Sequence, residues 1–172
     1  LEETVAQRTK TLAEQARHDG LTGLLNQNAF YRELKRELIR SSRLNYPVTL
    51  LYFDLDGFKQ LNDTKGHQEG DRILKKTADV IKEITRANEI TARYGGDEFC
   101  IILPDTLEAQ GEKLAQRVCT SLKTALKGSG VSCSIGLAVS TPDHPLDADA
   151  LVREGDAAMY RAKKQKGFSI CT

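Results

Sequence analysis

Apolar and polar positions alternate along the chain with two different periods. Apolar residues three and four apart predict helices over residues 27–42, 70–86, 106–126 and 147–164. Short runs rich in β-branched and aromatic residues predict strands over residues 48–53, 91–94, 98–103, 131–140 and 168–171. Turn-forming segments such as Asn45-Tyr46-Pro47 and Gly128-Ser129-Gly130 separate these elements. The pattern predicts a mixed α/β chain.

The order of the elements predicts how they assemble. From residue 48 onward it is strand, helix, strand, strand, helix, strand, the plan of a ferredoxin-like α+β domain. Right-handed crossovers leave the third strand beside the first and antiparallel to it. The end of the first strand, with Asp54 and Asp56, then lies next to the turn that carries Asp97 and Glu98. We expect these carboxylates to meet at one edge of a mixed central sheet flanked by helices.

The first 17 residues predict a separate helix. Leu1, Val5 and Leu12 form a narrow apolar stripe typical of a coiled-coil seam, but Arg8 and Gln15 occupy the alternate seam positions. A linker helix that leads to a missing sensory region and a frayed terminal helix both fit this pattern. We therefore divide the chain into a linker helix over residues 1–17 and one folded domain over residues 18–172.

Composition and charge narrow the classes of partner. The 172 residues are 40% hydrophobic and 28% charged, which is typical of a globular domain, and the formal net charge is only +1. So small a charge gives no global attraction to nucleic acid or anionic membranes, and the apolar runs are too short to insert into a bilayer. The four cysteines lack metal-finger spacing, which favours reduced thiols in a cytoplasmic protein.

The clustered carboxylates favour a bound cation, because carboxylates at close range repel one another unless neutralised. Oxygen ligands of this kind suit Mg²⁺, which takes one or two carboxylates together with substrate phosphates. A calcium loop of the EF-hand type is excluded, since Gly57 comes too early and Lys65 stands where the bidentate glutamate belongs.

The residues after the first strand favour a nucleotide. Gly57 at a strand-to-helix turn frees backbone N–H groups for phosphate oxygens, and Lys59 can supply positive charge to a transferring phosphoryl group. Asn62 and Asp71, with His67 between them, offer amide, carboxylate and imidazole groups. A carboxylate such as Asp71 can accept from the N1 and N2 edge of guanine.

Several separated motifs resemble one known family. They are Asp19-Gly20-Leu21-Thr22-Gly23-Leu24-Leu25-Asn26, Phe53-Asp54-Leu55-Asp56-Gly57-Phe58-Lys59-Gln60-Leu61-Asn62-Asp63, Gly66-His67, Gly70-Asp71 and Arg93-Tyr94-Gly95-Gly96-Asp97-Glu98-Phe99. In this order they are similar to the GGDEF family of diguanylate cyclases, and the resemblance covers residues 18–165. It implies a sheet like that of polymerase palm domains and a cytoplasmic bacterial signalling enzyme.

The resemblance also implies roles for individual residues. Asp54, Asp97 and the Leu55 carbonyl would hold Mg²⁺, or Mn²⁺ in its place, and Asp97 would help to deprotonate a 3′-hydroxyl. Lys59 would stabilise charge on the phosphates. The remaining substrate-binding positions would be Phe58, Asn62, His67, Asp71, Gly95, Gly96 and, at the terminal phosphates, Lys163.

The implied reaction joins two GTP molecules into cyclic di-GMP with release of two pyrophosphates. Each domain would hold one GTP, so the domain would act as a homodimer of two-fold symmetry, with cyclic di-GMP as product and possible inhibitor. A non-catalytic domain that binds GTP or cyclic di-GMP remains the alternative. Taken singly, Asp54 could be a helix cap and Gly95-Gly96-Asp97 a simple hairpin turn.

The chain departs from the family pattern in two places. The product-inhibition pair is expected as Arg-x-x-Asp, but here it is Arg86 followed by Glu89, whose side chain is one methylene longer. Product binding there therefore stays open. The family usually continues after the last helix into a glycine, a basic residue and an asparagine, whereas this chain has Lys166-Gly167-Phe168. Lys164 or Lys166 would have to substitute for the second phosphate-binding cation.

Overall fold

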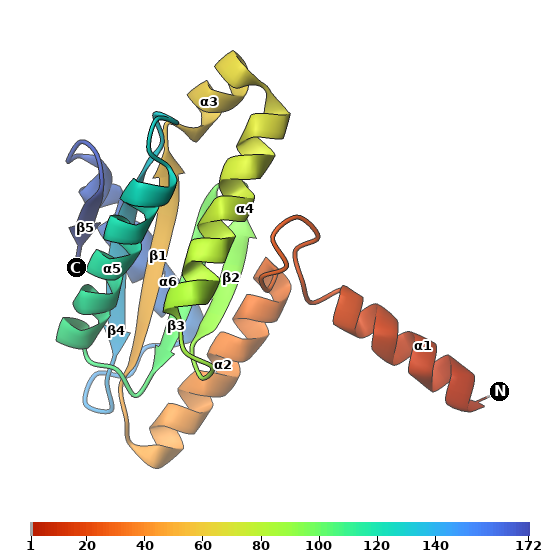
Figure 1. Cartoon of the computed structure of the whole chain (residues 1–172). Coiled ribbons are helices and arrows are strands. Elements are labelled where there is room, and N and C mark those ends of the chain that lie inside the picture. The colour runs from red at the N-terminus through yellow and green to blue at the C-terminus, as the bar shows by residue number, and fades with distance from the viewer. Residues whose placement is uncertain (1) are drawn as a thin grey trace.

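A five-stranded sheet in the order β2-β3-β1-β4-β5 forms the centre of the chain, in a computed structural model that describes residues 2–172 (Figure 1). The strands are β1 (Val48–Asp56), β2 (Ile90–Gly95), β3 (Glu98–Pro104), β4 (Ser132–Ser140) and β5 (Ser169–Cys171). The helices are α1 (Glu2–Gln15), α2 (Gln27–Leu44), α3 (Phe58–Lys65), α4 (His67–Ile84), α5 (Glu108–Ala125) and α6 (Ala148–Lys163). The predicted α/β class and ferredoxin-like strand order are confirmed.

The sheet topology places β3 beside β1 and antiparallel to it, as predicted. The predicted first strand, however, was too short. β1 continues to Asp56 because its other neighbour, β4, pairs with it along its whole length, from Val48 opposite Ser140 to Asp56 opposite Ser132. The sequence pattern stopped at Phe53 because carboxylates are uncommon within strands. Asp54 and Asp56 are therefore held rigidly in the ladder.

The segment between β1 and residue 70 was wrongly predicted as a polar connection. It contains α3 and the first turn of α4, separated by Gly66, whose φ of 86° ends one helix and begins the next. Leu61 is the only buried residue of α3, so the apolar period that reveals a helix is missing there. This helical hairpin carries most of the predicted guanine-binding residues.

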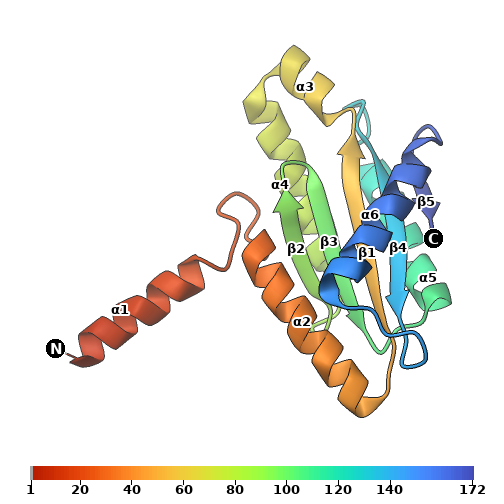
Figure 2. The same ribbon diagram turned by 180° about the vertical axis from the view of Figure 1, so that it is seen from behind.

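Helices cover both faces of the sheet. α4 and α5 lie on one face and α2 and α6 on the other, as the two opposite views show (Figures 1 and 2). β1 alternates between the two cores: Phe53 and Leu55 belong to the α4–α5 side, and Leu50 and Tyr52 to the α2–α6 side. Each of these side chains is almost fully buried, which stabilises the fold by roughly 1.5–3 kcal/mol apiece. The same alternation directs Asp54 toward α6.

The N-terminal helix α1 extends away from the domain (Figure 2). Val5 and Leu12 of the predicted seam are 62% and 65% exposed, and Leu1 lies outside the described residues. The division into a linker helix and one domain stays a prediction. None of the helices in the described part of the chain combines the length and apolarity that crossing a membrane requires.

Candidate active site

Three predicted metal-binding groups lie together at the end of β1. Asp54 is paired in register with Glu98 of β3, and the Leu55 N–H donates a hydrogen bond to the Asp97 carbonyl at 3.1 Å. Asp54 and Leu55 of β1 therefore lie next to Asp97, which is in the turn that leads into the adjacent strand β3. The juxtaposition that the strand order predicts is present in the backbone.

Asp54 is a strongly perturbed carboxylate at this edge. The residue is 5% exposed, its Oδ2 forms an ion pair with Lys163 Nζ, and its Oδ1 is buried without a hydrogen-bond partner among the described residues. Burial raises the pKa of Asp54 to about 6 despite the opposing effect of Lys163, and the negative charges of Asp56 and Asp97 add to the rise. This edge of the sheet is thus a cluster of acidic groups around a buried carboxylate, which favours a further cation.

The donor set fits a magnesium ion shared with a nucleotide. No three side chains of His, Cys, Asp or Glu gather into a complete metal cage within residues 2–172. Mg²⁺ does not need one, since it commonly takes one or two carboxylates and completes its shell with phosphates and water. The orphaned Asp54 Oδ1 beside the Asp97 turn supplies such an oxygen.

Asp56 has a different role from Asp54, although both end the same strand. Its Oδ2 accepts a hydrogen bond of 2.5 Å from the Ser134 hydroxyl of β4. Ser134 is fully buried and lies opposite Asp54 in the β1–β4 pair. Asp56 is therefore tied to the sheet, and we do not count it among the metal ligands.

The α3–α4 hairpin forms the second wall of the site. Asn62 Oδ1 is buried without a partner, and a Cβ at Gly70 would stand 1.9 Å from it and 3.2 Å from the Phe58 ring. The absence of a side chain at Gly70 therefore allows Asn62 and Phe58 to pack where they do. The sequence alone does not reveal this role of Gly70, because the role depends on helix α3, which the apolar pattern did not predict.

The remaining predicted substrate-binding residues are exposed around this wall. Lys59 lies in the first turn of α3, and His67 and Asp71 in the first turns of α4, with side chains accessible to solvent. Gly95 and Gly96 form the exposed turn between β2 and β3, and Gly96 adopts a φ of 46°. Lys163 is the exception among them, since it binds Asp54 instead of standing free for phosphates.

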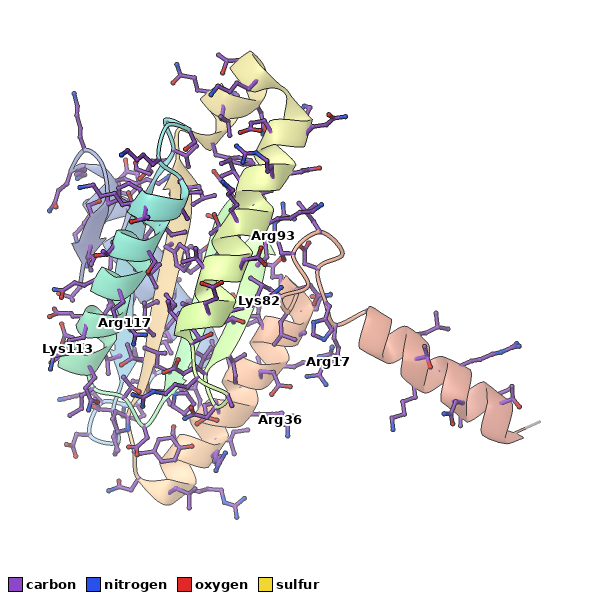
Figure 3. The ribbon with its side chains drawn as sticks, viewed as in Figure 1. Arg17, Arg36, Lys82, Arg93, Lys113 and Arg117 are labelled. Atoms are coloured by element: carbon purple, nitrogen blue, oxygen red, sulfur yellow. The ribbon has the colours of Figure 1, made fainter. Side chains whose placement is uncertain are left out.

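Arg93 anchors this turn to the N-terminal turn of the domain. Its Nε and Nη2 donate to the Gly96 carbonyl at 2.9 and 2.7 Å, and its Nη1 donates to the Asp19 carboxylate at 3.1 Å. Figure 3 labels Arg93 together with Lys82 of α4. From α4, Lys82 Nζ donates to the Thr22 carbonyl at 2.6 Å. Arg93 thus supports the turn, and its partnership with Asp19 has no local sequence signal.

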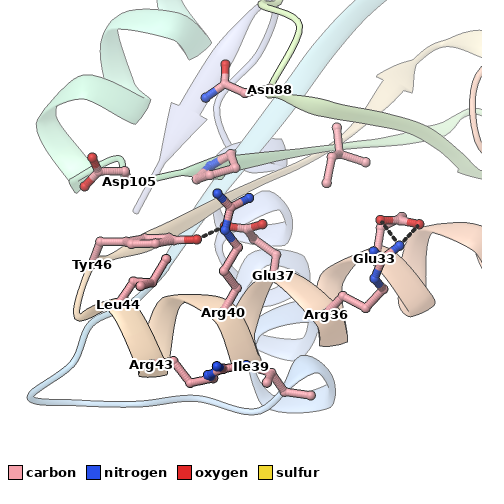
Figure 4. Close-up of a pocket in the computed structure, with 12 residues that line it drawn as sticks. Glu33, Arg36, Glu37, Ile39, Arg40, Arg43, Leu44, Tyr46, Asn88 and Asp105 are labelled. Carbon is pink, nitrogen blue, oxygen red and sulfur yellow. Dashed lines mark hydrogen bonds and ion pairs between the residues drawn. The ribbon is translucent and has the colours of Figure 1, made fainter.

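The predicted product-inhibition pair lies far from this edge, in the loop that precedes β2. The carboxylate of Glu89 accepts a hydrogen bond of 2.7 Å from the Arg86 backbone N–H, so the longer side chain folds back onto its own loop. Asn88 of the same loop lines a surface cavity of about 840 Å³ with Arg36, Arg40 and Arg43 of α2 (Figure 4). The sequence pattern did not predict that α2 lines a cavity beside this loop.

A palm-like sheet with a buried acidic edge, a glycine turn and a helical wall defines a nucleotide-handling domain, and the comparisons identify which one. The chain belongs to the GGDEF family: the family model described as "Diguanylate cyclase, GGDEF domain" matches residues 16–168. This match covers nearly all of the domain predicted over residues 18–172.

Two curated relatives show both the likeness and its limits. The diguanylate cyclase DgcS of Shewanella oneidensis is 36% identical over 160 residues, which cover 92% of this chain and 53% of DgcS. The cyclic di-GMP phosphodiesterase PdeR of Escherichia coli is 34% identical over 160 residues, which cover 91% of this chain and 24% of PdeR. The chain thus spans about half of one relative and a quarter of the other.

A solved structure agrees in fold over the same residues. The GGDEF domain of DgcB from Caulobacter crescentus in complex with c-di-GMP has a TM-score of 0.83 and 29% identity, covering 91% of this chain and 95% of that one. A longer structure of DgcB with its coiled coil has the same TM-score at 27% identity and covers 98% of this chain and 92% of that one.

Proposed function

We propose that this domain is an active diguanylate cyclase that joins two GTP molecules into cyclic di-GMP and releases two pyrophosphates. The observation that carries the proposal is the buried Asp54 oxygen without a partner, held beside the Asp97 turn. An unpaired buried acceptor is costly unless a ligand satisfies it. If Asp54 had only a structural role, nothing would offset the free-energy cost of burying this oxygen.

A divalent ion, Mg²⁺ or Mn²⁺, would be held by Asp54, Asp97 and the Leu55 carbonyl. When bound, it would supply the positive charge that the attacking and leaving oxygens develop. Asp97 would accept the proton of the 3′-hydroxyl. Lys59, exposed at the start of α3, would pair with the phosphates.

The guanine would bind along the α3–α4 hairpin. Phe58 and Asn62, whose Oδ1 is buried, form its inner side, and the exposed His67 and Asp71 its outer side. Asp71 would accept from the N1–H and N2–H groups that distinguish guanine from adenine. The exposed Gly95-Gly96 turn leaves room for the nucleotide to lie across the hairpin.

Catalysis would require two copies of the domain. One domain holds one GTP, and the attacking oxygen belongs to the other, so a symmetric pair must place the two reactants in line. The projecting helix α1, with Val5 and Leu12 exposed, would bring two copies together as a coiled coil in the cytoplasm. DgcB, which this chain resembles, has such a coiled coil.

The product would bind a second time at the far end of the sheet. Arg86 would contact cyclic di-GMP there, and the basic α2 residues Arg36, Arg40 and Arg43 line the adjoining cavity. Arginine suits guanine and phosphate edges because its guanidinium forms paired hydrogen bonds. Glu89, bonded within its own loop, would first have to release the Arg86 backbone.

The competing function is a non-catalytic nucleotide-binding domain. The resemblance to PdeR, which is named for the opposite activity, is the observation in its favour.

The experiment that tests the proposed function is incubation of the purified chain with GTP and Mg²⁺ over a range of protein concentrations, with detection of cyclic di-GMP and pyrophosphate. We expect activity per molecule to rise with concentration. GTP binding without product would support the non-catalytic domain, and product from ATP but not GTP would overturn the guanine assignment.

A further inference from the structure

Two cysteine thiols lie close together behind the acidic edge of the sheet. Cys119 Sγ of α5 is 3.9 Å from Cys133 Sγ of β4. Cys133 is fully buried, whereas Cys119 is partly exposed at the side of the same core. A disulfide requires a sulfur separation near 2.05 Å, so a small displacement of α5 and β4 against each other would join them.

Cys133 occupies a position directly behind the proposed metal site. It pairs in register with Leu55, whose carbonyl is one of the proposed ligands, and its neighbour Ser134 pairs with Asp54. Any displacement of β4 at Cys133 therefore acts on the part of β1 that carries Asp54.

The segment between the two cysteines also touches the proposed phosphate-binding turn. A Cβ at Gly57 would stand 3.0 Å from the Gly130 carbonyl, so these two turns are in close contact. Gly128 and Gly130 both adopt positive φ values, 81° and 77°, which fix the path of the turn. Closure of a ring from residue 119 to residue 133 would pull on the contact with Gly57.

From this geometry we propose that Cys119 and Cys133 form an oxidisable thiol pair, whose disulfide disturbs the metal-binding edge and switches the domain to a less active form. The oxidant is a hydroperoxide such as hydrogen peroxide. The thiol pair is independent of the proposed function, but the effect on activity rests on it.

The reaction balances in two steps. The Cys119 thiolate attacks one oxygen of hydrogen peroxide, the O–O bond breaks, and the released hydroxide takes up a proton to leave as water. Cys133 sulfur then attacks the resulting Cys119 sulfenic acid, the S–S bond forms and the S–O bond breaks. The thiol proton of Cys133 leaves with the hydroxide as a second water. Two electrons pass from the two sulfurs to the peroxide.

The surroundings of the two thiols favour Cys119 as the attacking group. The hydrogen bond between the two thiols lowers the pKa of Cys119. Cys133, by contrast, is fully buried in the core. A thiolate that is partly accessible reacts with peroxide, whereas a buried thiol serves as its resolving partner.

The experiment treats the reduced, folded chain with hydrogen peroxide, alkylates the remaining thiols and maps peptides without reductant. We expect a cross-linked peptide joining Cys119 and Cys133, with Cys100 still alkylatable once the chain is denatured. Amide exchange at residues 54–57 should become faster, and cyclic di-GMP formation should fall by about tenfold, since small displacements at a catalytic site are costly. Dithiothreitol should restore both.

Cys119→Ser is the matched control, because its site is partly exposed and the substitution keeps the size of the side chain. It should keep its activity and amide exchange unchanged by peroxide. Absence of the cross-link in the wild-type chain would overturn the thiol pair, whatever the activity. A cross-link with unchanged amide exchange at residues 54–57 would overturn the coupling to the metal-binding edge. An inactive reduced chain that still shows the cross-link and faster exchange would contradict the proposed function alone.

Discussion

Lys163, the last residue of α6, forms an ion pair with Asp54 at the end of β1. Desolvation acts against the charge of Lys163, but the Asp54 carboxylate and the nearby charges of Asp56 and Asp97 together raise its pKa. The lysine expected at the terminal phosphates is therefore held at the edge proposed to bind the metal ion. From there it can serve a triphosphate that shares the same cation.

Replacement of Lys163 should weaken nucleotide binding. We expect Lys163→Gln to lower the affinity for GTP in the presence of Mg²⁺ by about tenfold, the usual cost of losing a charge-assisted hydrogen bond. Lys113→Gln is the control, since Lys113 is exposed on α5 and has no part in the proposed site. Titration with a fluorescent GTP analogue measures both. Equal affinities for the two variants would show that Lys163 does not reach the phosphates.

The raised pKa of Asp54 predicts the direction of a pH effect on stability. Because the pKa rises from 3.8 to about 6 on folding, the folded chain binds more protons than the unfolded chain between these values. The contribution of Asp54 to the free energy of unfolding therefore falls as pH rises through this window, by roughly 3 kcal/mol at most. Urea unfolding in EDTA should find Asp54→Asn at least as stable as wild type at pH 8, with the gap closing near pH 4. A strongly destabilised variant at pH 8 would contradict this.

Replacement of Gly70 should change nucleotide binding more than it changes the stability of the fold. Alanine in a helix is intrinsically favoured over glycine by about 1 kcal/mol, but a Cβ at this position would collide with Asn62. We expect Gly70→Ala to keep its melting temperature and to lose preference for GTP over ATP.

Gly111→Ala is the control variant for Gly70→Ala. A Cβ at Gly111 would lie 2.7 Å from Thr49 Cγ2 and 3.2 Å from Leu137 in the core of the α5 side. This variant should lose stability and keep its nucleotide preference. If Gly70→Ala binds GTP and ATP with the same ratio of affinities as wild type, the role proposed for Asn62 in guanine binding is contradicted.

Much of this site could be predicted from the sequence, and the failures have physical causes. The meeting of Asp54 with Asp97 follows from strand order, because a split βαβ plan fixes which strand ends are neighbours. Helix α3 was missed because a single buried Leu61 gives no period. The partnerships of Arg93 with Asp19 and of Lys163 with Asp54 join residues far apart in the chain, and no local pattern reports such contacts.

Arg93 should couple the N-terminal turn at Asp19 to the turn at Gly96 and Asp97, which is proposed to be catalytic. We expect Arg93→Ala and Asp19→Asn each to reduce cyclic di-GMP formation, and the double variant to cost less than the sum of the two. A coupling free energy of about 0.5–3 kcal/mol is typical of residues in one network. Rates of the four proteins in a double-mutant cycle give this quantity. Strict additivity would mean that the hydrogen bonds between Arg93 and Asp19 do not influence the turn.

The most direct test of the proposed site is Mn²⁺ binding in the presence of GTP, followed by electron paramagnetic resonance. Wild type and Asp56→Asn, whose side chain bonds to Ser134, should both bind the ion, whereas Asp54→Asn and Asp97→Asn should each lose most of the binding. Undiminished Mn²⁺ binding in Asp97→Asn would contradict the shared site, and with it the catalytic centre proposed for this chain.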